Sequence, residues 1–328
     1  SYNDALGAGG PRSLFLKIPH VLSESSAVLG VDDHAEVDFY REVAPGIGCP
    51  PLVRCYDAAY LNETKHSHIL LEDLTETHSQ PEQNTAPCED MSRLAVEALA
   101  KVHARCWKQP ISHLGSAQSD LAHWGIPASS AAPPLKRQHS YLVPEFDLRR
   151  FISNLNSSVT RFLDVADLTP AQEREYRRML HAADLIWGRL TRREHLTVTH
   201  GDLHWWNFLY PRDPYAHSVR LIDWHLWHMD VGARDLAFLL ALGGFAEPRP
   251  EIEAELLDVY HETLIQNGVA GYSAEMLMED YRWSAIRNLN IPVIYWSQGK
   301  HYTTWQTALR RALAAYERLD CTSLLVVR

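Results

Sequence analysis

The stretch that decides the fold of this chain reads THGDLHWWNFLY and spans residues 199–210. A short gap separates it from VRLIDW at residues 219–224 and from GARDLA at residues 232–237. Short apolar runs, which are typical of buried strands, lead into the first two segments. The acids and amides that follow them are oxygen ligands of the kind that Mg²⁺ and Ca²⁺ prefer. The stretch therefore predicts a cation site.

The composition is that of an ordinary globular protein. Of the 328 residues, 46% are hydrophobic and 22% are charged, which suffices for one large or two modest domains. The formal net charge of −10 argues against nucleic-acid binding, because phosphate neutralisation requires a surplus of Lys and Arg. A cationic ligand would suit this charge, although an acidic, solvated surface is the commoner explanation.

Cysteine usage and hydropathy bear on the setting of the protein. The five cysteines are odd in number and show no C-x-x-C spacing, which predicts free thiols in a reducing compartment. No apolar run approaches the roughly 18 residues of a membrane span, and no signal peptide is visible at the start. These features favour a cytoplasmic protein that is not embedded in a membrane.

The first part of the chain carries strand-like runs and one lysine in an unusual place. Lys17 lies within the apolar run LFLKI, where an ammonium group is costly unless it meets an anion. A helix is predicted to follow and to end near Pro45. Glu36 on this helix is the natural partner of Lys17. Glu42 is the competing partner, and a solvated helix with neither glutamate paired is the remaining alternative.

The rest of the chain is mainly helical. The strand-like run ILLEDL at residues 69–74 is followed by a polar, proline-containing stretch that predicts a domain boundary. Apolar residues recur at helical spacing over 91–106, and Thr169 begins a capping box whose helix is expected to run to about Leu190. After Asp235 we expect helices in about four segments, broken at Pro248, Gly268, Pro292 and Gly299. Strands come first and helices afterwards, which indicates an α+β fold.

The spacing within the central stretch points to phosphoryl transfer. Asn207 follows Asp202 by five residues, and His200 precedes Asp202 by two. This is the H-x-D-x-x-x-x-N spacing of a catalytic loop in which the aspartate accepts a hydroxyl proton and the asparagine binds magnesium. Asp223, at the end of an apolar run, stands where such enzymes place a metal-chelating acid.

These motifs resemble the aminoglycoside phosphotransferase and choline kinase-like family of small-molecule kinases. The resemblance covers nearly the whole chain and implies a bilobal, protein-kinase-like fold with a small β-rich N-lobe over residues 1–73 and a mainly helical C-lobe over residues 74–328. It also implies ATP and Mg²⁺ as cofactors and a small-molecule hydroxyl as the acceptor. The oligomeric state and the identity of the acceptor stay open.

The same resemblance implies a role for each site residue. Asp202 would orient and deprotonate the acceptor. His200 would belong to the same catalytic loop, and Asp235 would brace that loop. Asn207 and Asp223 would hold Mg²⁺. Lys17, paired with Glu36, would hold nucleotide phosphates, and adenine would meet the hinge at Glu72, Asp73 and Leu74.

This chain departs from the family pattern in two places, and its motif spacing also bears on the class of substrate. Trp205 and Trp206 place aromatic bulk inside the catalytic loop, where many relatives carry smaller residues. Only sixteen residues precede Lys17, and they contain neither the expected first strand nor a clear glycine-rich phosphate loop. Twelve residues separate Asp223 from Asp235, which is too short for the activation segment that positions a protein substrate in protein kinases. We therefore do not expect a protein substrate.

Two other functions are compatible with parts of the sequence. A dense cluster of histidines and aspartates suggests a zinc or two-metal hydrolase, but this hypothesis leaves Asn207, Lys17 and Glu36 unexplained. The cluster contains His200, Asp202, His204, Asp223, His225, His228 and Asp230. A catalytically silent nucleotide-binding protein of the same fold is the third hypothesis, and the missing glycine loop is its one support.

Aromatic residues are abundant in the helical half, where the acceptor pocket is expected. Aromatic faces beside carboxylates suit an amine or a quaternary ammonium, and they suit a flat apolar alcohol equally well. Core packing between helices would explain about half of them. The residues that we expect to face the acceptor are His204, Trp205, Trp224, Trp283 and Trp296.

Overall fold

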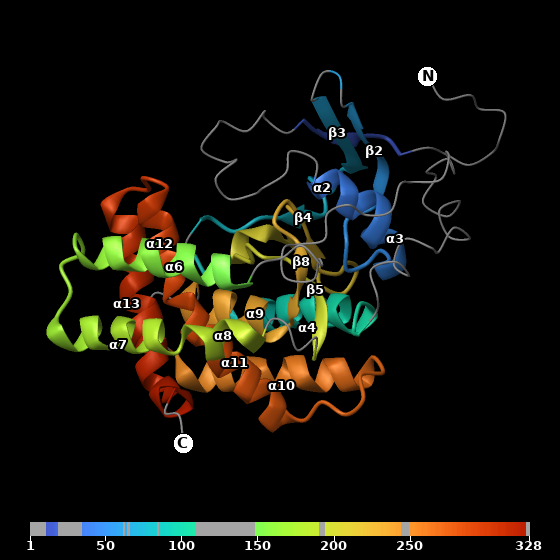
Figure 1. Cartoon of the computed structure of the whole chain (residues 1–328). Helices are drawn as coiled ribbons and strands as arrows, with labels where there is room; N and C mark the ends of the chain where they lie inside the picture. The colour runs from blue at the N-terminus through green and yellow to red at the C-terminus, as the bar shows by residue number, and fades with distance from the viewer. Residues whose placement is uncertain are drawn as a thin grey trace.

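The computed structural model describes residues 11–18, 35–61, 63, 66–83, 85–108, 148–189, 194–243 and 249–325. Within these ranges a small sheet with one helical segment packs on a larger, mainly helical lobe (Figure 1). The expected two-lobed α+β arrangement is therefore confirmed. The expected break at Pro248 lies outside the described residues.

The N-terminal lobe contains an antiparallel sheet with the strand order β1-β3-β2. Its strands are β1 (Leu14–Lys17), β2 (Cys55–Leu61) and β3 (His66–Glu72). Lys17 lies opposite Ile69, so the end of β1 is fixed against the central strand. A helical segment next to the sheet comprises α2 (Ala35–Asp38), the π-helical turn η2 (Phe39–Val43) and α3 (Ala44–Ile47).

The sequence predicted that this helical segment ends near Pro45, but the segment continues through Pro45 to Ile47. Proline is tolerated there because it lies in the first turn of α3, where its missing N–H has no partner to lose. The segment ends at Gly48, whose φ of 92° lies in the left-handed region that glycine adopts without strain.

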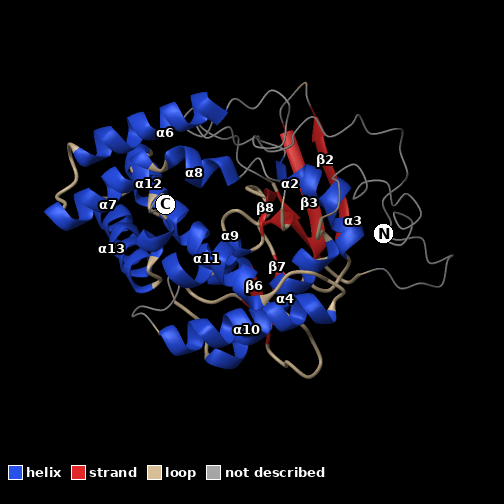
Figure 2. Ribbon diagram, turned by 60° about the horizontal axis from the view of Figure 1, so that its bottom comes forward, coloured by secondary structure: helices blue, strands red, loops and turns tan. Residues whose placement is uncertain are grey.

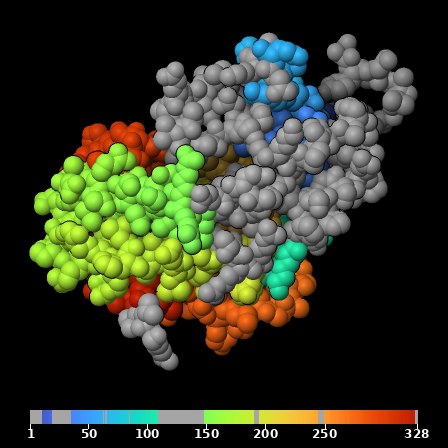
Figure 3. Space-filling view, in the orientation of Figure 1, coloured from blue at the N-terminus to red at the C-terminus, as the bar shows by residue number. Residues whose placement is uncertain are grey.

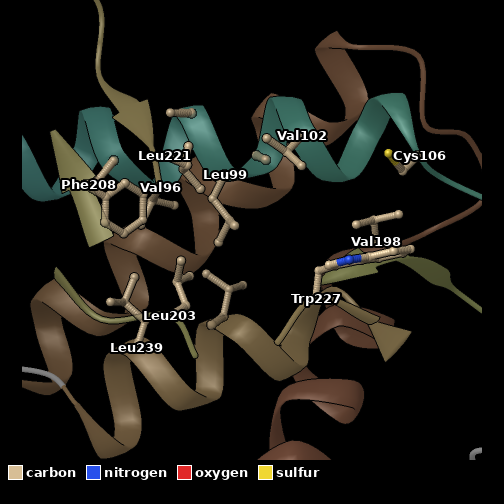
Figure 4. Packing of buried hydrophobic residues seen from close by; sticks show 14 of the residues in the cluster. Val96, Leu99, Val102, Cys106, Val198, Leu203, Phe208, Leu221, Trp227 and Leu239 are labelled. Atoms are coloured by element: carbon tan, nitrogen blue, oxygen red, sulfur yellow. The ribbon is translucent and has the colours of Figure 1, made fainter. Parts of the chain in front are cut away.

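The centre of the larger lobe is α4 (Glu89–Arg105), whose apolar face packs against short antiparallel ribbons. Figure 4 shows Val96, Leu99 and Val102 of α4 above the side chains of Leu203 and Leu239. One ribbon pairs β5 with β8, and a second sheet has the order β4-β6-β7. The strands are β4 (His78–Ser79), β5 (Leu196–Thr199), β6 (Phe208–Pro211), β7 (Arg220–Leu221) and β8 (His228–Val231).

Helices complete this lobe and form a second apolar cluster at its far end. Figures 2 and 3 show α6 and α7 together at that end, opposite the strands of the N-terminal lobe. The helices are α6 (Leu148–Leu163), α7 (Pro170–His181), α8 (Ala183–Gly188), α9 (Ala233–Leu236), the π-helix η6 (Ala237–Leu242), α10 (Pro250–Gln266), α11 (Ala274–Asn288), α12 (Asn290–Ser297) and α13 (Tyr302–Arg318). Two 3₁₀ turns are η5 (Trp205–Asn207) and η7 (Cys321–Leu324).

The helix boundaries partly follow the sequence pattern. The capping box at Thr169 is confirmed, because its side chain accepts from the N–H of Gln172 and the Gln172 side chain accepts from the N–H of Thr169. The predicted helix to Leu190 is wrong in its length, since α7 ends at His181 and α8 is a separate helix. Pro292 does not break a helix, because it lies in the first turn of α12.

Across the described ranges, every helix is too short or too polar to cross a bilayer.

Candidate active site

Lys17 joins the two lobes through two carboxylates. Its Nζ lies 2.6 Å from Glu36 Oε2 and 2.6 Å from Asp223 Oδ1. Burial alone would lower the pKa of Lys17, but the charges of Glu36 and Asp223 outweigh burial and raise it above its ordinary value. Lys17 therefore stays a cation between the two lobes. Of the two glutamates that the sequence offered as its partner, the structure selects Glu36 over Glu42.

Glu36 is itself held against the turn that carries Asp223. The backbone N–H of Trp224 donates to Glu36 Oε1 at 3.3 Å. The indole of Trp224 stacks on Phe39 of η2, with ring centroids 4.1 Å apart and an interplanar angle of 5°. These contacts fix the helical segment of the N-terminal lobe to the larger lobe, which sets the position of Glu36 and hence of Lys17.

Asp223 follows β7 in a left-handed backbone conformation, with φ of 69°. The turn directs its carboxylate towards Lys17 and towards His225, whose Nδ1 is 3.2 Å from Asp223 Oδ1. Burial raises the pKa of Asp223, but His225 and Lys17 together lower it well below its ordinary value. Asp223 is therefore an anion, and about a third of its side chain is exposed.

The predicted catalytic loop follows β5, includes η5 and is tied to the Asp223 turn. Burial lowers the pKa of His200, and its Nε2 donates to the carbonyl of Ile222 at 2.8 Å, one residue before Asp223. Asn207 Nδ2 donates to the carbonyl of Asp202 at 2.8 Å. Asp202 and the Asp223 turn therefore sit on one hydrogen-bonded framework.

Asp235 is almost fully buried, and its carboxylate holds the start of this loop through hydrogen bonds. It accepts the N–H of His200 at 2.6 Å and the N–H of Gly201 at 3.1 Å. Its Oδ2 lies 3.3 Å from His103 Nε2, and His103 Nδ1 contacts the hydroxyl of Tyr260 at 2.7 Å. Burial raises the pKa of Asp235, but His103 and the other donors lower it below its ordinary value. His103 is thus a core histidine whose partners are all internal.

At two glycines in the motifs, Gly201 and Gly232, neighbouring atoms leave no room for a side chain. Gly201 has φ of 82°, and a Cβ on it would lie 2.2 Å from the carbonyl of Leu226. A Cβ on Gly232 would lie 2.2 Å from the hydroxyl of Tyr260 and 2.8 Å from His103 Nδ1. A side chain on Gly232 would displace the brace around Asp235, and one on Gly201 would displace the backbone at Leu226.

We predict that Gly232→Ala lowers the free energy of unfolding by about 2 kcal/mol or more, because the new methyl must push Tyr260 or His103 aside. Chemical denaturation monitored by tryptophan fluorescence measures the effect. Gly188→Ala is the matched control, since a Cβ there meets nothing within 4 Å. Equal stability of the two variants would contradict the tight packing of the brace.

The three predicted hinge residues lie at the end of β3 or directly after it. The N–H of Glu72 donates to the carbonyl of Arg54 at 2.8 Å, and the carbonyl of Leu74 accepts the N–H of His78 at 2.9 Å. Asp73 accepts from the N–H and hydroxyl of Thr75, and these bonds lower the pKa of Asp73. The structure thus places these three residues between the lobes, and their contact with adenine stays a prediction.

Of the five residues predicted to face the acceptor, four tryptophans pack in the apolar clusters and one histidine lies beside Asp202. Trp205 and Trp224 are 1% and 0% exposed and belong to the core. Trp283 is also buried, with the guanidinium of Arg189 5.0 Å from its ring centroid. Trp296 packs on Phe162 in the second apolar cluster. Only His204 lies beside Asp202, with its Nε2 3.2 Å from Asp202 Oδ1.

Three aromatic residues outside this set of five lie near Asp202 or its partner His204. Trp206 stacks on His204 at 3.9 Å, and Phe238 of η6 meets the same ring edge-on at 4.9 Å. Burial raises the pKa of Tyr295, and the nearby charge of Asp202 raises it further. Trp206 is visible within the motif itself, whereas no sequence signal brings Phe238 or Tyr295 to this place.

The predicted metal cluster of a hydrolase is not formed. Within the described part of the chain, no three His, Cys, Asp or Glu side chains are grouped so that they could hold a metal ion. His200 is engaged with the backbone of Ile222, and Asp230 forms a buried ion pair with Arg287 at 2.6 Å. The hydrolase hypothesis therefore has no support.

Comparisons with known proteins show the family and the fold of this chain. The sequence model of the ecdysteroid kinase-like family matches residues 34–269. No curated protein matches the sequence significantly.

Solved structures of small-molecule kinases share the fold at low sequence identity. A provisionally assigned aminoglycoside phosphotransferase from Ralstonia eutropha JMP134 is 14% identical, with a TM-score of 0.53, over 88% of this chain and 84% of that chain. Choline kinase LicA from Streptococcus pneumoniae is 15% identical, with a TM-score of 0.53, over 93% and 86%. Plasmodium vivax ethanolamine kinase is 9% identical, with a TM-score of 0.51, over 92% and 75%. These similarities establish the protein-kinase-like fold.

Proposed function

Because the chain belongs to the ecdysteroid kinase-like family, we propose that it transfers the γ-phosphoryl group of ATP to a hydroxyl group of a small molecule. The observation that carries this proposal is the bridge of Lys17 to Glu36 and Asp223. Lys17 supplies a cation for phosphates, and Asp223 supplies an anion for a metal ion. The catalytic loop with Asp202 is attached to the same turn.

The residues present fit a magnesium nucleotide. Asp223 offers a partly exposed carboxylate, and Asn207 donates through Nδ2, which leaves its Oδ1 as an acceptor. These are hard oxygen ligands of the kind that Mg²⁺ binds. When bound, Mg-ATP supplies the phosphoryl group and neutralises the charge that develops during its transfer. Lys17 would hold phosphate oxygens, and Glu36 would keep Lys17 in place.

Asp202 carries the proton transfer in this proposal. Burial raises the pKa of Asp202, but His204 and other histidines lower it below its ordinary value, so the carboxylate is ionised at neutral pH. It would align the acceptor hydroxyl and take its proton as the oxygen bonds to phosphorus. The chain forms no covalent bond itself, so its contribution is alignment and electrostatics.

The surroundings of Asp202 favour a neutral, largely apolar alcohol as the acceptor. Trp206, Phe238 and Tyr295 lie near Asp202 or its partner His204. Several buried carboxylates of the helical lobe already have basic partners, as in the pairs Asp230–Arg287, Glu253–Arg318 and Asp280–Arg189. These acids are therefore poor candidates for binding a cationic amine, and a hydroxylated steroid, as the family's name suggests, fits better.

An acceptor panel tests this choice. The protein is incubated with Mg-ATP and, separately, an ecdysteroid, a simple sterol, choline, ethanolamine and an aminoglycoside, and phosphorylated products are identified by mass spectrometry. We expect product with the ecdysteroid and little with choline or the aminoglycoside. Preferential phosphorylation of a cationic amine would overturn the choice of acceptor while leaving the kinase proposal intact.

Lys17→Ala is expected to lower kcat/KM for ATP by roughly 10²-fold, because one charged group that holds the phosphates is lost. Steady-state kinetics with varied ATP measure the effect. Lys101→Ala is the matched control, since Lys101 is an exposed lysine that pairs with Glu97 on α4. Wild-type use of ATP by Lys17→Ala would contradict the role of Lys17.

The end of strand β3 supports a boundary between the two lobes. We place the lobe boundary between Asp73 and Leu74, directly after β3 ends at Glu72.

All five cysteines are free, and Cys55, Cys106 and Cys321 are buried. Burial raises the pKa of each of these three thiols to about 12, so they are unreactive thiols that suit a reducing cytoplasm.

A further inference from the structure

His204 sits in an aromatic slot beside the reacting centre. One face of its ring stacks on Trp206 at a centroid distance of 3.9 Å and an interplanar angle of 12°. The edge of Phe238 meets it at 4.9 Å and 67°. With both neighbours in place, only 15% of the His204 side chain is exposed. The plane of the ring is therefore fixed by packing.

Backbone contacts hold the two aromatic neighbours. Gln80, which follows β4, donates from its side chain to the carbonyl of Trp206. On the other side, η6 ends with a π-type hydrogen bond from the N–H of Gly243 to the carbonyl of Phe238 at 2.7 Å. A Cβ on Gly243 would come within 3.5 Å of His204 Nδ1. The slot is thus closely fitted around the ring.

The two nitrogens of His204 have different surroundings. Nδ1 is buried and has no hydrogen-bond partner among the described residues. Nε2 lies 3.2 Å from Asp202 Oδ1. Because a carboxylate can only accept a hydrogen bond, Nε2 must carry the hydrogen for this contact to be favourable.

Asp202 needs such a partner. The bonds of Asp202 to Asn207 and to the ring of His200 both use its backbone, and they do not fix the rotation of its carboxylate. The terminal torsion of aspartate is broad, so an unrestrained carboxylate samples many orientations. Within the described part of the chain, His204 is the one basic side chain that contacts this carboxylate.

We infer that His204 is a positioning residue: its Nε2–H holds Asp202 Oδ1 and thereby aims Oδ2 at the acceptor hydroxyl. This inference rests on the proposed function for its effect on turnover. His204 was predicted from the sequence to face the acceptor, and the structure instead assigns it to the carboxylate that acts on the acceptor. It forms and breaks no bond during the reaction.

His204→Phe keeps a flat ring in the slot and removes the donor. We expect kcat to fall about 10- to 100-fold with KM for ATP unchanged, because misplacement of a reacting group by about 1 Å can cost 10²-fold. His204→Gln carries an N–H near the position of Nε2 and should restore part of kcat. His68→Phe is the matched control, because His68 pairs with Asp57 at 2.7 Å on the surface.

A double variant separates positioning from simple structural damage. In an Asp202→Asn background, His204→Phe should cause no further loss, since its effect passes through the carboxylate. Additive losses, or wild-type kcat in His204→Phe alone, would overturn the inference. So would a change confined to KM for ATP.

Nuclear magnetic resonance of ¹⁵N-histidine-labelled protein provides a readout that needs no acceptor. The His204 signals are identified by their disappearance in His204→Phe. We expect the hydrogen on Nε2, and a hydrogen found on Nδ1 alone would overturn the inference. If wild-type protein phosphorylates no acceptor, the proposed function fails, whereas the ring signals still decide the role of His204.

Discussion

Asp202→Asn is expected to lower kcat roughly 10³-fold, one of the two largest losses that we predict for a single substitution. Asparagine has nearly the same size as aspartate and keeps the backbone bonds to Asn207 and His200. It cannot take the proton of an acceptor hydroxyl, and it has no charge with which to align that hydroxyl. Steady-state turnover with saturating ATP and acceptor measures the loss.

Nucleotide binding by Asp202→Asn should be unchanged, because the phosphates are assigned to Lys17 and the metal to Asp223 and Asn207. Thermal shifts with Mg-ATP test this separation, since a ligand that binds the native state stabilises it by mass action. Asp213→Asn is the control, because Asp213 is exposed and only caps a turn at Tyr215. Near-normal turnover in Asp202→Asn would contradict the assignment of the base.

Asp223→Asn is expected to abolish the magnesium dependence of nucleotide binding and to lower turnover by about 10³-fold. The carboxylate is the stronger of the two proposed metal ligands, and a bound metal ion is worth several kcal/mol to a developing charge. Lys17 keeps its second partner, Glu36, at 2.6 Å, so the local fold around Lys17 should survive.

The measurement for Asp223→Asn compares thermal shifts with ATP in the presence of Mg²⁺ and of a chelator. Wild-type protein should be stabilised more with Mg²⁺, and the variant should show equal shifts under both conditions. A magnesium-dependent shift that persists in Asp223→Asn would contradict the metal site. Lys17→Ala then serves as a comparison, because it should weaken nucleotide binding with and without the metal.

The sequence pattern and the family resemblance together predicted part of the site's geometry. The contact of Lys17 with Glu36, one of three alternatives that the pattern left open, is found. The position of Asp235 against the predicted catalytic loop, which the resemblance implied, is found as well. The roles of these residues in catalysis stay predictions, whereas the fold and the family resemblance are confirmed.

The acceptor side could not be predicted in the same way. Trp205 and Trp224 lie in the motifs, but their indoles fill the core, because burial depends on the packing of distant elements. Tyr295 comes from α12 and Phe238 from a π-helix, and neither position has a local signal that directs it towards Asp202. The π-helical turns also escape prediction, since their hydrogen-bond spacing differs from the α-helical periodicity of the sequence.

The central claim is that this chain moves a phosphoryl group from ATP to a small-molecule hydroxyl. Its most direct test uses ATP labelled at the γ-phosphate, Mg²⁺ and the acceptor panel, followed by separation of labelled products. We predict a labelled phosphate ester that forms with wild-type protein and a hydroxyl acceptor and is nearly absent with Asp202→Asn. Label found only in ATP or in free phosphate, with every acceptor and with protein that binds Mg-ATP, would contradict the claim.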